Sequence, residues 1–581
     1  MKNLTLVFLL ILGSSFAYGQ VSRLDNFDPH KSAKASRAFR AKQFEKAAQL
    51  YYEIASANPE RGFYWYRAAM SYIGIKDVQK AHECFKKCVK TSGYSFMVNP
   101  MLGLARTYAM LNQPKKAVET LKELFSYDVN RMGMVYKLPE FQTEAYQKNP
   151  EFLALFGGKF PGKQSRVAGW RFDLNLLAKK MREVHYNLFA EVDKTTWTNA
   201  VKALDQKIPQ LKDYEIVAEL MKLVALDRST QMYTPTNQYA MHRLPVNIYW
   251  FDDGVFIRAT TPENKALVGA KILKIGNQSI EQLLKAARKY ITYENEMSFK
   301  ARAPRFLQTP ELLMMENATN SVEKVKMTVE TNGKKKVVTV KAMTFAELLQ
   351  KYGAEVSKIP NFDERVPMKS WVSMQASNKT PLYLENPYEN YHSKYFPEQN
   401  VYYTQFNFSG SKKSGSIINF CNGLTEKVNK KGAKAWIIDL RFLHRGSVYS
   451  NRAIMEALVK ANTNLRGKIF GIIGRETYQV GQHLAQDMEY RCPMVWAGEA
   501  TGGRPNFAYD NNVLTLPYSS IKVNIPHNYV QGGPSRNLDK RQYLGTYLGV
   551  GLTSQDYKEG FDPALEAIFK YIKTDPRRGK K

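Results

Sequence analysis

The chain has 581 residues, a length that predicts about three or four domains because one domain usually holds about 100–200 residues. Hydrophobic residues make up 44% and charged residues 24%, which excludes wholesale disorder. Lysine and arginine (84) exceed aspartate and glutamate (53), and the resulting formal charge of +31 bears on partners rather than on fold. Four cysteines are too few for a disulfide scaffold.

Residues 1–19 have the pattern of a signal peptide. Lys2 supplies the positive start, Leu4 to Leu12 form a short apolar run, and Ala17-Tyr18-Gly19 is a small-x-small cleavage site. We therefore expect an exported protein, either periplasmic or secreted. No later stretch approaches the ~18 apolar residues of a spanning segment, so we expect no transmembrane helix.

Residues 25–160 contain a repeat. Ala47, Ala81 and Ala117 close similar four-residue segments, at offsets of 34 and 36 residues. Helix pairs with this spacing stack into an α-solenoid, and the pattern resembles tetratricopeptide repeats without their Trp-x-x-Leu-Gly start. Such a solenoid either binds peptides on its concave face or acts as a docking arm, and the sequence favours neither. Cys84 and Cys88 are interpreted as two buried side chains rather than a metal pair or a disulfide.

The next two regions differ in periodicity. Residues 165–235 show helical spacing, for example at Leu177, Met181 and Leu188, which predicts a helical bundle. Residues 245–345 predict an α+β module, in which Asn332-Gly333 between alternating segments indicates a type I′ hairpin. The lysines at 334–336 beside this turn are interpreted as a solvated hairpin tip, with contact to an anionic surface as the alternative.

Residues 380–575 alternate between short apolar runs and helical stretches. The runs lie at Ile417-Ile418, 435–440 and 469–473, and the helical stretches lie near 421–431, 450–462 and 480–490. Such alternation predicts βα units and a largely parallel sheet that is covered on both faces. The expected fold is therefore multidomain, with an α-solenoid, a helical bundle, an α+β module and an α/β core.

Several segments of the second half stand in an order that one protein family shares. They are Leu267–Gly276, Ile437–Arg441, Gly474–Tyr478, Gly498–Gly503 and Asp562–Leu565. Together they resemble the C-terminal-processing, or tail-specific, serine proteases over roughly residues 170–575. The resemblance implies a ClpP/crotonase-like core after a helical bundle and a PDZ-like module.

The catalytic residues that the resemblance implies are absent from the positions where the family has them. Gln479 replaces the nucleophilic Ser, Arg504 replaces the Lys base that lies 25 residues further on, and Ser229 replaces the His base of another branch. An amide offers no nucleophile, and a guanidinium keeps its proton. The oxyanion loop should be Gly-Asn-Gly-Gly-Gly but runs from Phe442 to Gly446, so only its last glycine remains.

Other polar residues surround these positions in the sequence. His444 and His483 could form a rebuilt pair with Ser447 or Ser450, but we interpret them as the rim of a polar pocket. The further candidate cleft residues are Gly502 and Gly503. Arg504 would bind a ligand carboxylate such as a peptide C-terminus, or it pairs with Glu499 or Asp510 of this chain.

Two functions follow from these observations. The first is an exported, non-catalytic peptide- or protein-binding or scaffold protein on a serine-protease-like fold with a lost active site. The alternative is an exported serine endopeptidase with a rebuilt site. We expect protein or peptide segments as partners, including free C-termini, and anionic envelope components. We expect no nucleic acid, no cofactor and no metal, because no nucleic-acid motif and no His/Cys ligand spacing occurs.

Overall fold

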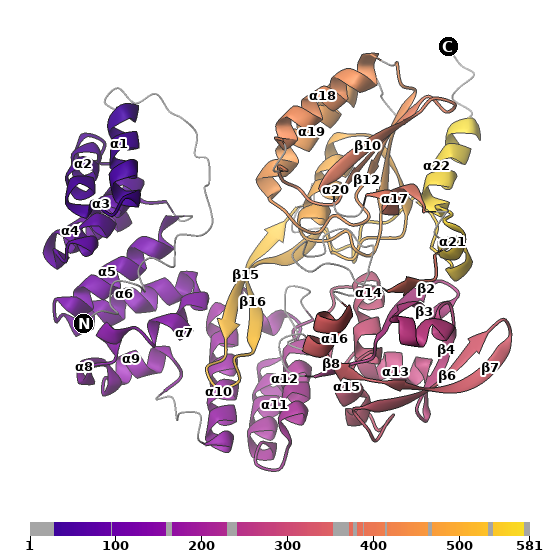
Figure 1. Cartoon of the computed structure of the whole chain (residues 1–581), viewed down its shortest axis with the longest axis horizontal. Coiled ribbons are helices and arrows are strands. Elements are labelled where there is room, and N and C mark those ends of the chain that lie inside the picture. The colour runs from indigo at the N-terminus through magenta and orange to yellow at the C-terminus, as the bar shows by residue number, and fades with distance from the viewer. Residues whose placement is uncertain are drawn as a thin grey trace. The chain divides into compact units, whose positions relative to one another are not determined.

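The computed structural model consists of two compact units. The first is Met1–Lys179 with Asn512–Tyr518, and the second is Lys180–Asn511 with Ser519–Lys581 (Figure 1). The structure describes residues 28–93, 96–158, 165–228, 241–352, 371–375, 380–386, 389–412, 415–430, 432–462, 468–532 and 539–574. The expected signal peptide and Ser229 lie outside these residues.

The first unit begins with helices that pack against their neighbours in sequence. Ala47, Ala81 and Ala117 are each fully buried, which agrees with a packing role at the repeat period. The turns inside the first three helix pairs also repeat, because Lys42, Lys76 and Asn112 all have positive φ (59°, 64° and 55°). The helices are α1 (Pro29–Arg40), α2 (Phe44–Ala57), α3 (Gly62–Gly74), α4 (Val78–Thr91), α5 (Val98–Met110), α6 (Pro114–Tyr127), α7 (Met132–Val135), α8 (Glu144–Gln147) and α9 (Pro150–Leu155), with 3-10 turns at Val129–Arg131 and Pro139–Phe141.

The predicted helical N-terminal region is thus confirmed, while its identification with tetratricopeptide repeats stays a prediction. Cys84 and Cys88 are buried free thiols, as interpreted from the sequence. Burial raises the pKa of each thiol to about 12, so neither is a reactive thiolate at neutral pH.

The tip of a hairpin from late in the chain completes the first unit. The Tyr518 ring lies 5.6 Å from the Trp170 ring, and the Tyr518 amide donates to Asp173 Oδ1 at 3.0 Å. Gly169 has no room for a side chain, because a Cβ there would lie 2.2 Å from the Tyr518 ring. Residues 512–518 therefore pack closely on the N-terminal half of helix α10 (Arg166–Val184).

Three helices precede the sheets. They are α10, α11 (Lys194–Lys207) and α12 (Asp213–Ala225), with a 3-10 turn at Leu188–Ala190. Leu177 and Met181 are fully buried on α10. Leu188 was expected on the same helix, but α10 ends at Val184 and Leu188 is buried from the 3-10 turn instead.

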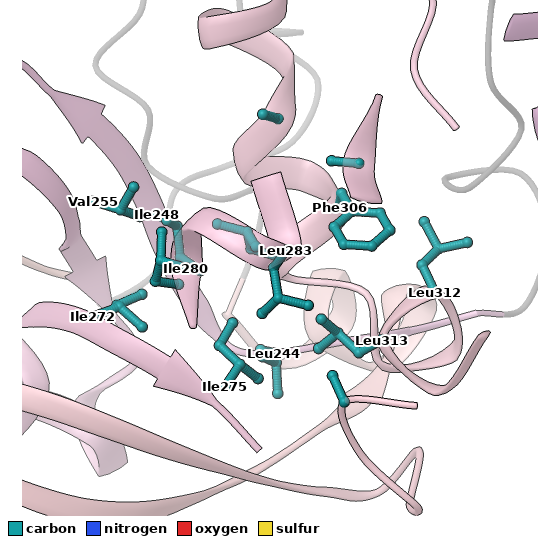
Figure 2. Close-up of a cluster of buried hydrophobic side chains, with 14 of the residues drawn as sticks. Leu244, Ile248, Val255, Ile272, Ile275, Ile280, Leu283, Phe306, Leu312 and Leu313 are labelled. Atoms are coloured by element: carbon teal, nitrogen blue, oxygen red, sulfur yellow. The ribbon is translucent and has the colours of Figure 1, made fainter. Parts of the chain in front are cut away.

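An α+β module follows, and its strands surround one apolar core. In Figure 2, Ile248, Val255 and Ile272 lie together beside the strands, and Leu283 lies between them and Phe306. Its strands are β1 (His242–Arg243), β2 (Val246–Phe251), β3 (Gly254–Thr260), β4 (Lys271–Ile275), β5 (Gln278–Ser279), β6 (Lys324–Thr331), β7 (Lys334–Lys341), β8 (Met343–Thr344) and β9 (Val372–Ser373). Its helices are α13 (Ile280–Ala287), α14 (Glu296–Leu307), α15 (Pro310–Met315) and α16 (Phe345–Tyr352), with a 3-10 turn at Pro262–Leu267.

The main sheet of this module has the order β2-β3-β4-β6-β7. The predicted Asn-Gly hairpin is confirmed, because Thr331 pairs with Lys334 and both turn residues have positive φ (51° and 74°). The lysines at 334–336 are exposed on β7, in agreement with the interpretation as a solvated tip. The identification of the module as PDZ-like stays a prediction.

The core of the second unit is a six-stranded sheet with the order β10-β11-β12-β13-β14-β17. Only the β10–β11 pairing is antiparallel, so the predicted parallel sheet is confirmed. On β12, Trp436 and Ile438 pack in one cluster with the helices α18–α20, whereas Ala435 and Ile437 pack with α22 on the other face. The elements are α17 (Leu382–Glu385), β10 (Tyr391–Phe396), β11 (Val401–Phe406), α18 (Ile417–Lys430), β12 (Ala435–Asp439), α19 (Val448–Asn462), β13 (Ile469–Ile473), α20 (Val480–Arg491), β14 (Met494–Gly498), β17 (Leu548–Gly549), α21 (Ser554–Glu559) and α22 (Pro563–Thr574).

Two details of the core differ from the sequence prediction. Ile417 and Ile418 begin α18 instead of forming a strand, since two apolar residues alone do not reveal a period. The strand before position 479 ends at Ile473, and residues 474–478 form a turn. A separate two-stranded sheet, β15 (Asn506–Thr515) and β16 (Lys522–Gln531), forms the hairpin whose tip belongs to the first unit.

Candidate functional site

The turn between β13 and α20 places Gln479 in an unusual backbone conformation. Gln479 is the N-terminal cap of α20, with φ 50° and ψ −116°. A residue with a side chain seldom adopts positive φ, and such strain is concentrated at functional turns. Position 479 thus has the sharp strand-to-helix turn that presents a nucleophile in hydrolases, but it carries an amide.

The loop after β12 interlocks with this turn. Thr477 Oγ1 donates to the carbonyl of Leu440 at 2.8 Å and accepts from the Gly474 amide at 3.1 Å. Gly481 must be a glycine, because a Cβ there would lie 1.8 Å from the carbonyl oxygen of Leu443. The loop that stands where an oxyanion loop is expected is therefore packed directly against the first turn of α20.

Gly446, the one glycine that remains in this loop, has a packing role. Its φ is 124°, and a Cβ there would lie 2.2 Å from the carbonyl oxygen of Ser409. Phe442 packs on Tyr383, with ring centroids 5.9 Å apart. Ser447 Oγ accepts from the Tyr449 amide at 3.3 Å, at the start of α19. Packing and hydrogen bonds within the fold therefore account for the residues Gly446, Phe442 and Ser447 of this loop.

The two candidate histidines take part in ring contacts. His444 stacks on Tyr478 at 4.9 Å with an interplanar angle of 9°, and its Nδ1 lies 3.1 Å from the carbonyl oxygen of Phe442. Burial, with the nearby Arg445 cation, lowers the pKa of His444 to about 3, so this ring is neutral at physiological pH. His483 contacts the rings of Phe507 and Tyr509 at 5.3 and 6.0 Å. Among the described residues, neither histidine is hydrogen-bonded to a serine.

The glycine turn after β14, which holds the candidate cleft residues Gly502 and Gly503, lies against the turn after β13. The Gly502 amide donates to the carbonyl of Thr477 at 3.2 Å, and a Cβ on Gly502 would lie 2.1 Å from the carbonyl oxygen of Arg475. Gly503 faces Gln482, which is fully buried on α20. Both amide atoms of Gln482 lack a hydrogen-bond partner within the described part of the chain.

Arg504 is bound by carboxylates of its own chain. Its Nη1 pairs with Glu191 Oε1 at 3.0 Å, its amide donates to Glu294 Oε2 at 2.8 Å, and its Nε donates to the Glu294 carbonyl at 2.8 Å. The expected pairing with Glu499 is wrong, because that carboxylate binds Arg475. The side chain of Asp510 lies outside the described residues.

Beside this turn, at the carboxyl ends of the parallel strands, lies a cavity of about 80 Å³. Arg441 on its wall donates to both oxygens of Asp562 (3.1 and 2.8 Å) and from Nε to Asp439 (2.9 Å). Arg475 donates from Nε to Glu499 at 2.8 Å and from Nη1 to the Trp250 carbonyl at 2.7 Å. Two cations of the wall are therefore fully engaged.

Burial alone would raise the pKa of Glu499, but Arg475 and Lys300 outweigh it, so the pKa of this carboxyl lies below its ordinary value. Glu476 differs, because burial raises its pKa in spite of four arginines nearby. Arg441, Arg475, Glu476 and Glu499 lie in segments that carry the resemblance, but sequence reasoning did not predict that they line one cavity, since those segments are far apart in the chain.

Two absences apply to the described residues only. They contain no group of three or more His, Cys, Asp or Glu side chains placed to hold a metal ion. No helix in them has both the length and the apolar composition that crossing a membrane requires.

Comparison with known proteins gives solved structures with a similar fold. Mature CPAF aligns at 10% identity and a TM-score of 0.49, covering 71% of this chain and 98% of CPAF. The photosystem II D1 C-terminal processing protease aligns at 10% identity and a TM-score of 0.34 (70% and 98% covered). A putative S41 protease from Bacteroides fragilis aligns at 12% identity and a TM-score of 0.26 (57% and 83% covered).

No family model and no curated protein matches the chain. Alignments at this identity and TM-score assign neither a family nor an activity to this chain.

Proposed function

We propose that this chain is an exported, non-catalytic peptide- or protein-binding or scaffold protein, built on a serine-protease-like fold whose active site is lost. The carrying observation is Gln479 in the strained turn at the start of α20. The backbone conformation that would expose a nucleophile is present, while the side chain has neither hydroxyl nor thiol.

The surroundings of position 479 support the same proposal. A general base must reach the nucleophile and must accept a proton at working pH. Arg504 keeps its proton and is held by Glu191 and Glu294. His444 is buried against Tyr478 and directs Nδ1 to a backbone carbonyl. The former catalytic groups that the structure describes are therefore engaged in packing and pairing.

The finer parts of the proposal concern binding. A tetratricopeptide-like solenoid offers a concave surface for extended peptides, and a PDZ-like module would add a peptide strand. The β7 edge of the α+β module is an unsuitable place for such a strand, because its exposed lysines at 334–336 are typical of edges protected from pairing. Export through the signal peptide, a periplasmic or secreted location and contact with anionic envelope components belong to this proposal.

A fluorophosphonate probe on the full chain tests the loss of catalysis. We expect no covalent labelling of the wild type and no hydrolysis of unfolded casein. We expect the same for Gln479→Ser, because catalytic groups act as a unit and a lone serine lacks its base and oxyanion donors. An active serine peptidase serves as positive control for the probe.

The alternative, an exported serine endopeptidase with a rebuilt site, predicts labelling of the wild type. Ser447→Ala and His444→Phe are then the matched variants, because these residues are the nearest candidates for a rebuilt pair. Labelling that disappears in Ser447→Ala would establish the alternative and overturn the proposal. Labelling of Gln479→Ser alone would show that a working base survives.

A further inference from the structure

The cavity beside the turn is separate from position 479. Ile472 lines it from β13 and packs in the cluster with α22, whereas α20 packs on the opposite face of the sheet. Gln479 is not part of its wall. Binding in this cavity therefore does not depend on whether the chain is catalytic.

Most charged groups in the cavity wall are already neutralised. Arg441 is bound by Asp562 and Asp439, and Arg475 is bound by Glu499. A buried charge requires such pairing because desolvation is costly. These ion pairs stabilise the cavity wall, and the cations and carboxylates that form them are not available to a ligand.

Arg258 is the exception among the cations. It is 6% exposed, its Nε donates to Asn247 Oδ1 at 2.9 Å, and its guanidinium lies 5.0 Å above the Tyr249 ring. Within the described residues, its two Nη atoms have neither a hydrogen-bond acceptor nor a carboxylate within ion-pair distance. A nearly buried guanidinium with a free fork of donors is a costly arrangement unless something binds it.

A second unpartnered donor lies in the same wall. The Tyr383 side chain is only 3% exposed, and its buried hydroxyl has no hydrogen-bond partner in the part of the chain that the structure describes. A buried hydroxyl without a partner costs free energy, so such groups usually have a protein or ligand partner. Arg258 and Tyr383 come from β3 and α17, so the cavity brings together two donors from distant parts of the chain.

We propose that this cavity is a binding site for one carboxylate group, held by the free Nη atoms of Arg258 and by the Tyr383 hydroxyl. Two carboxylate oxygens match the two Nη donors of a guanidinium, a geometry that Lys cannot provide. The space of about 80 Å³ has room for such a group with a short carbon chain, since about 10–15 Å³ on the same measure is enough to hold one water.

Glu476 decides the sign of the ligand charge. Its carboxyl lines the cavity and has no partner among the described residues, so it would attract an ammonium ligand and repel a carboxylate. The four arginines around Glu476 (Arg302, Arg305, Arg475 and Arg258) offset that repulsion. Replacing this carboxyl by an amide therefore distinguishes the two ligand charges directly.

The carboxylate could come from a free small acid or from the C-terminus of a peptide. Propionate tests the first source, and a pair of acetylated tripeptides with free and amidated C-termini tests the second. Calorimetric titration into the full-length chain measures all three. We expect propionate or the free-acid peptide to bind, and we expect no binding of the amidated peptide.

Four variants make the proposal falsifiable. Arg258→Met should weaken carboxylate binding by about 10- to 100-fold, because it removes charge-assisted hydrogen bonds. Tyr383→Phe should weaken binding about fivefold without lowering the melting temperature, since its hydroxyl bonds nothing in the fold. Glu476→Gln should strengthen binding. Arg452→Met, at an exposed arginine paired with Glu456, is the control and should change nothing.

Several results would overturn the proposal. Absence of binding for both carboxylate sources would do so, as would unchanged affinity in both Arg258→Met and Tyr383→Phe. Weaker carboxylate binding in Glu476→Gln would show that this carboxyl helps to hold the ligand, against the repulsion that the proposal requires. Covalent labelling of the chain by the fluorophosphonate probe, by contrast, would contradict the proposed function and leave this carboxylate site unaffected.

Discussion

The turn after β13 and the cavity that its residues Gly474–Glu476 help to line are neighbours in the fold. They differ in whether their polar groups have hydrogen-bond partners. In the turn, Thr477 is hydrogen-bonded on both sides and the neighbouring glycines admit no side chain. In the cavity, Arg258 and Tyr383 have donors without a hydrogen-bond partner among the described residues. The fold accounts for a polar group whose hydrogen bonds are all made, whereas a buried donor without a partner, such as the amide of Gln482 on α20 as well, requires an explanation of its own. The turn at Gln479 has the backbone geometry of a hydrolase nucleophile turn, whereas the cavity is the place where we propose that a ligand binds.

The largest expected effect on stability comes from a substitution that disrupts the turn after β13. Gly481→Ala places a Cβ 1.8 Å from the backbone carbonyl oxygen of Leu443, so the loop and helix must separate. We expect a loss of about 4 kcal/mol in the free energy of unfolding, or failure to fold. Urea titration measures it.

The matched control is Gly423→Ala, on α18, where a Cβ meets nothing within 4 Å. This change should stabilise the chain by up to about 1 kcal/mol through helix propensity. Equal effects of the two substitutions would show that the turn is not tightly packed.

The second prediction breaks an engaged pair in the cavity wall. Glu499→Gln leaves the buried Arg475 without its carboxylate, and we expect a cost of about 3 kcal/mol at pH 7. The pKa of Glu499 is lowered in the folded state, so its contribution is present above the unfolded-state pKa of about 4.3 and is lost as pH falls through the folded pKa. The stability curves of wild type and variant should therefore converge below about pH 4. Parallel curves down to pH 3 would argue against the pair.

The third prediction concerns the strain at position 479. Gln479→Gly removes the side chain at φ 50° and should stabilise the fold by about 1 kcal/mol, since strain of this kind costs about 1–3 kcal/mol and glycine loses part of that gain in chain entropy. Gln555→Gly, at a helical position of α21, should instead destabilise by about 1 kcal/mol. Thermal unfolding compares the two, and destabilisation by both would show that the turn is relaxed.

The smallest expected effect has the opposite sign to that of Glu499. The folded-state pKa of Glu476 is raised, so the wild type loses stability as pH rises from about 4.3 through the folded pKa. Glu476→Gln removes this loss, and its advantage should grow with pH over that interval. A variant that is less stable than the wild type at neutral pH would reveal a partner for this carboxyl.

Local patterns predicted much of the fold. The Asn-Gly turn, the alternation of the core strands and the repeat of buried alanines all depend on neighbours within a few residues, and the structure agrees with each. The short run at Ile417-Ile418 was misassigned because two residues fit both periods.

The candidate site was less predictable, because its contacts join distant parts of the chain. Arg504 meets Glu294 and Glu191, which lie 210 and 313 residues away in sequence, so no local pattern could name them. Motif comparison identified position 479, since its neighbours are sequential. The cavity donor Arg258 belongs to no motif, and only the folded chain brings it together with Tyr383.

The hairpin tip at Asn512–Tyr518 determines how late in synthesis the first unit can finish folding. Its residues belong to the same unit as the N-terminal helices, so that unit lacks its last segment until the ribosome has passed residue 518. At about 5–20 residues per second, the interval after Lys179 lasts roughly 20–70 s. Throughout this interval Trp170 lacks the Tyr518 ring that later covers it, so the emerging chain carries an uncovered aromatic surface while most of its length is still being made.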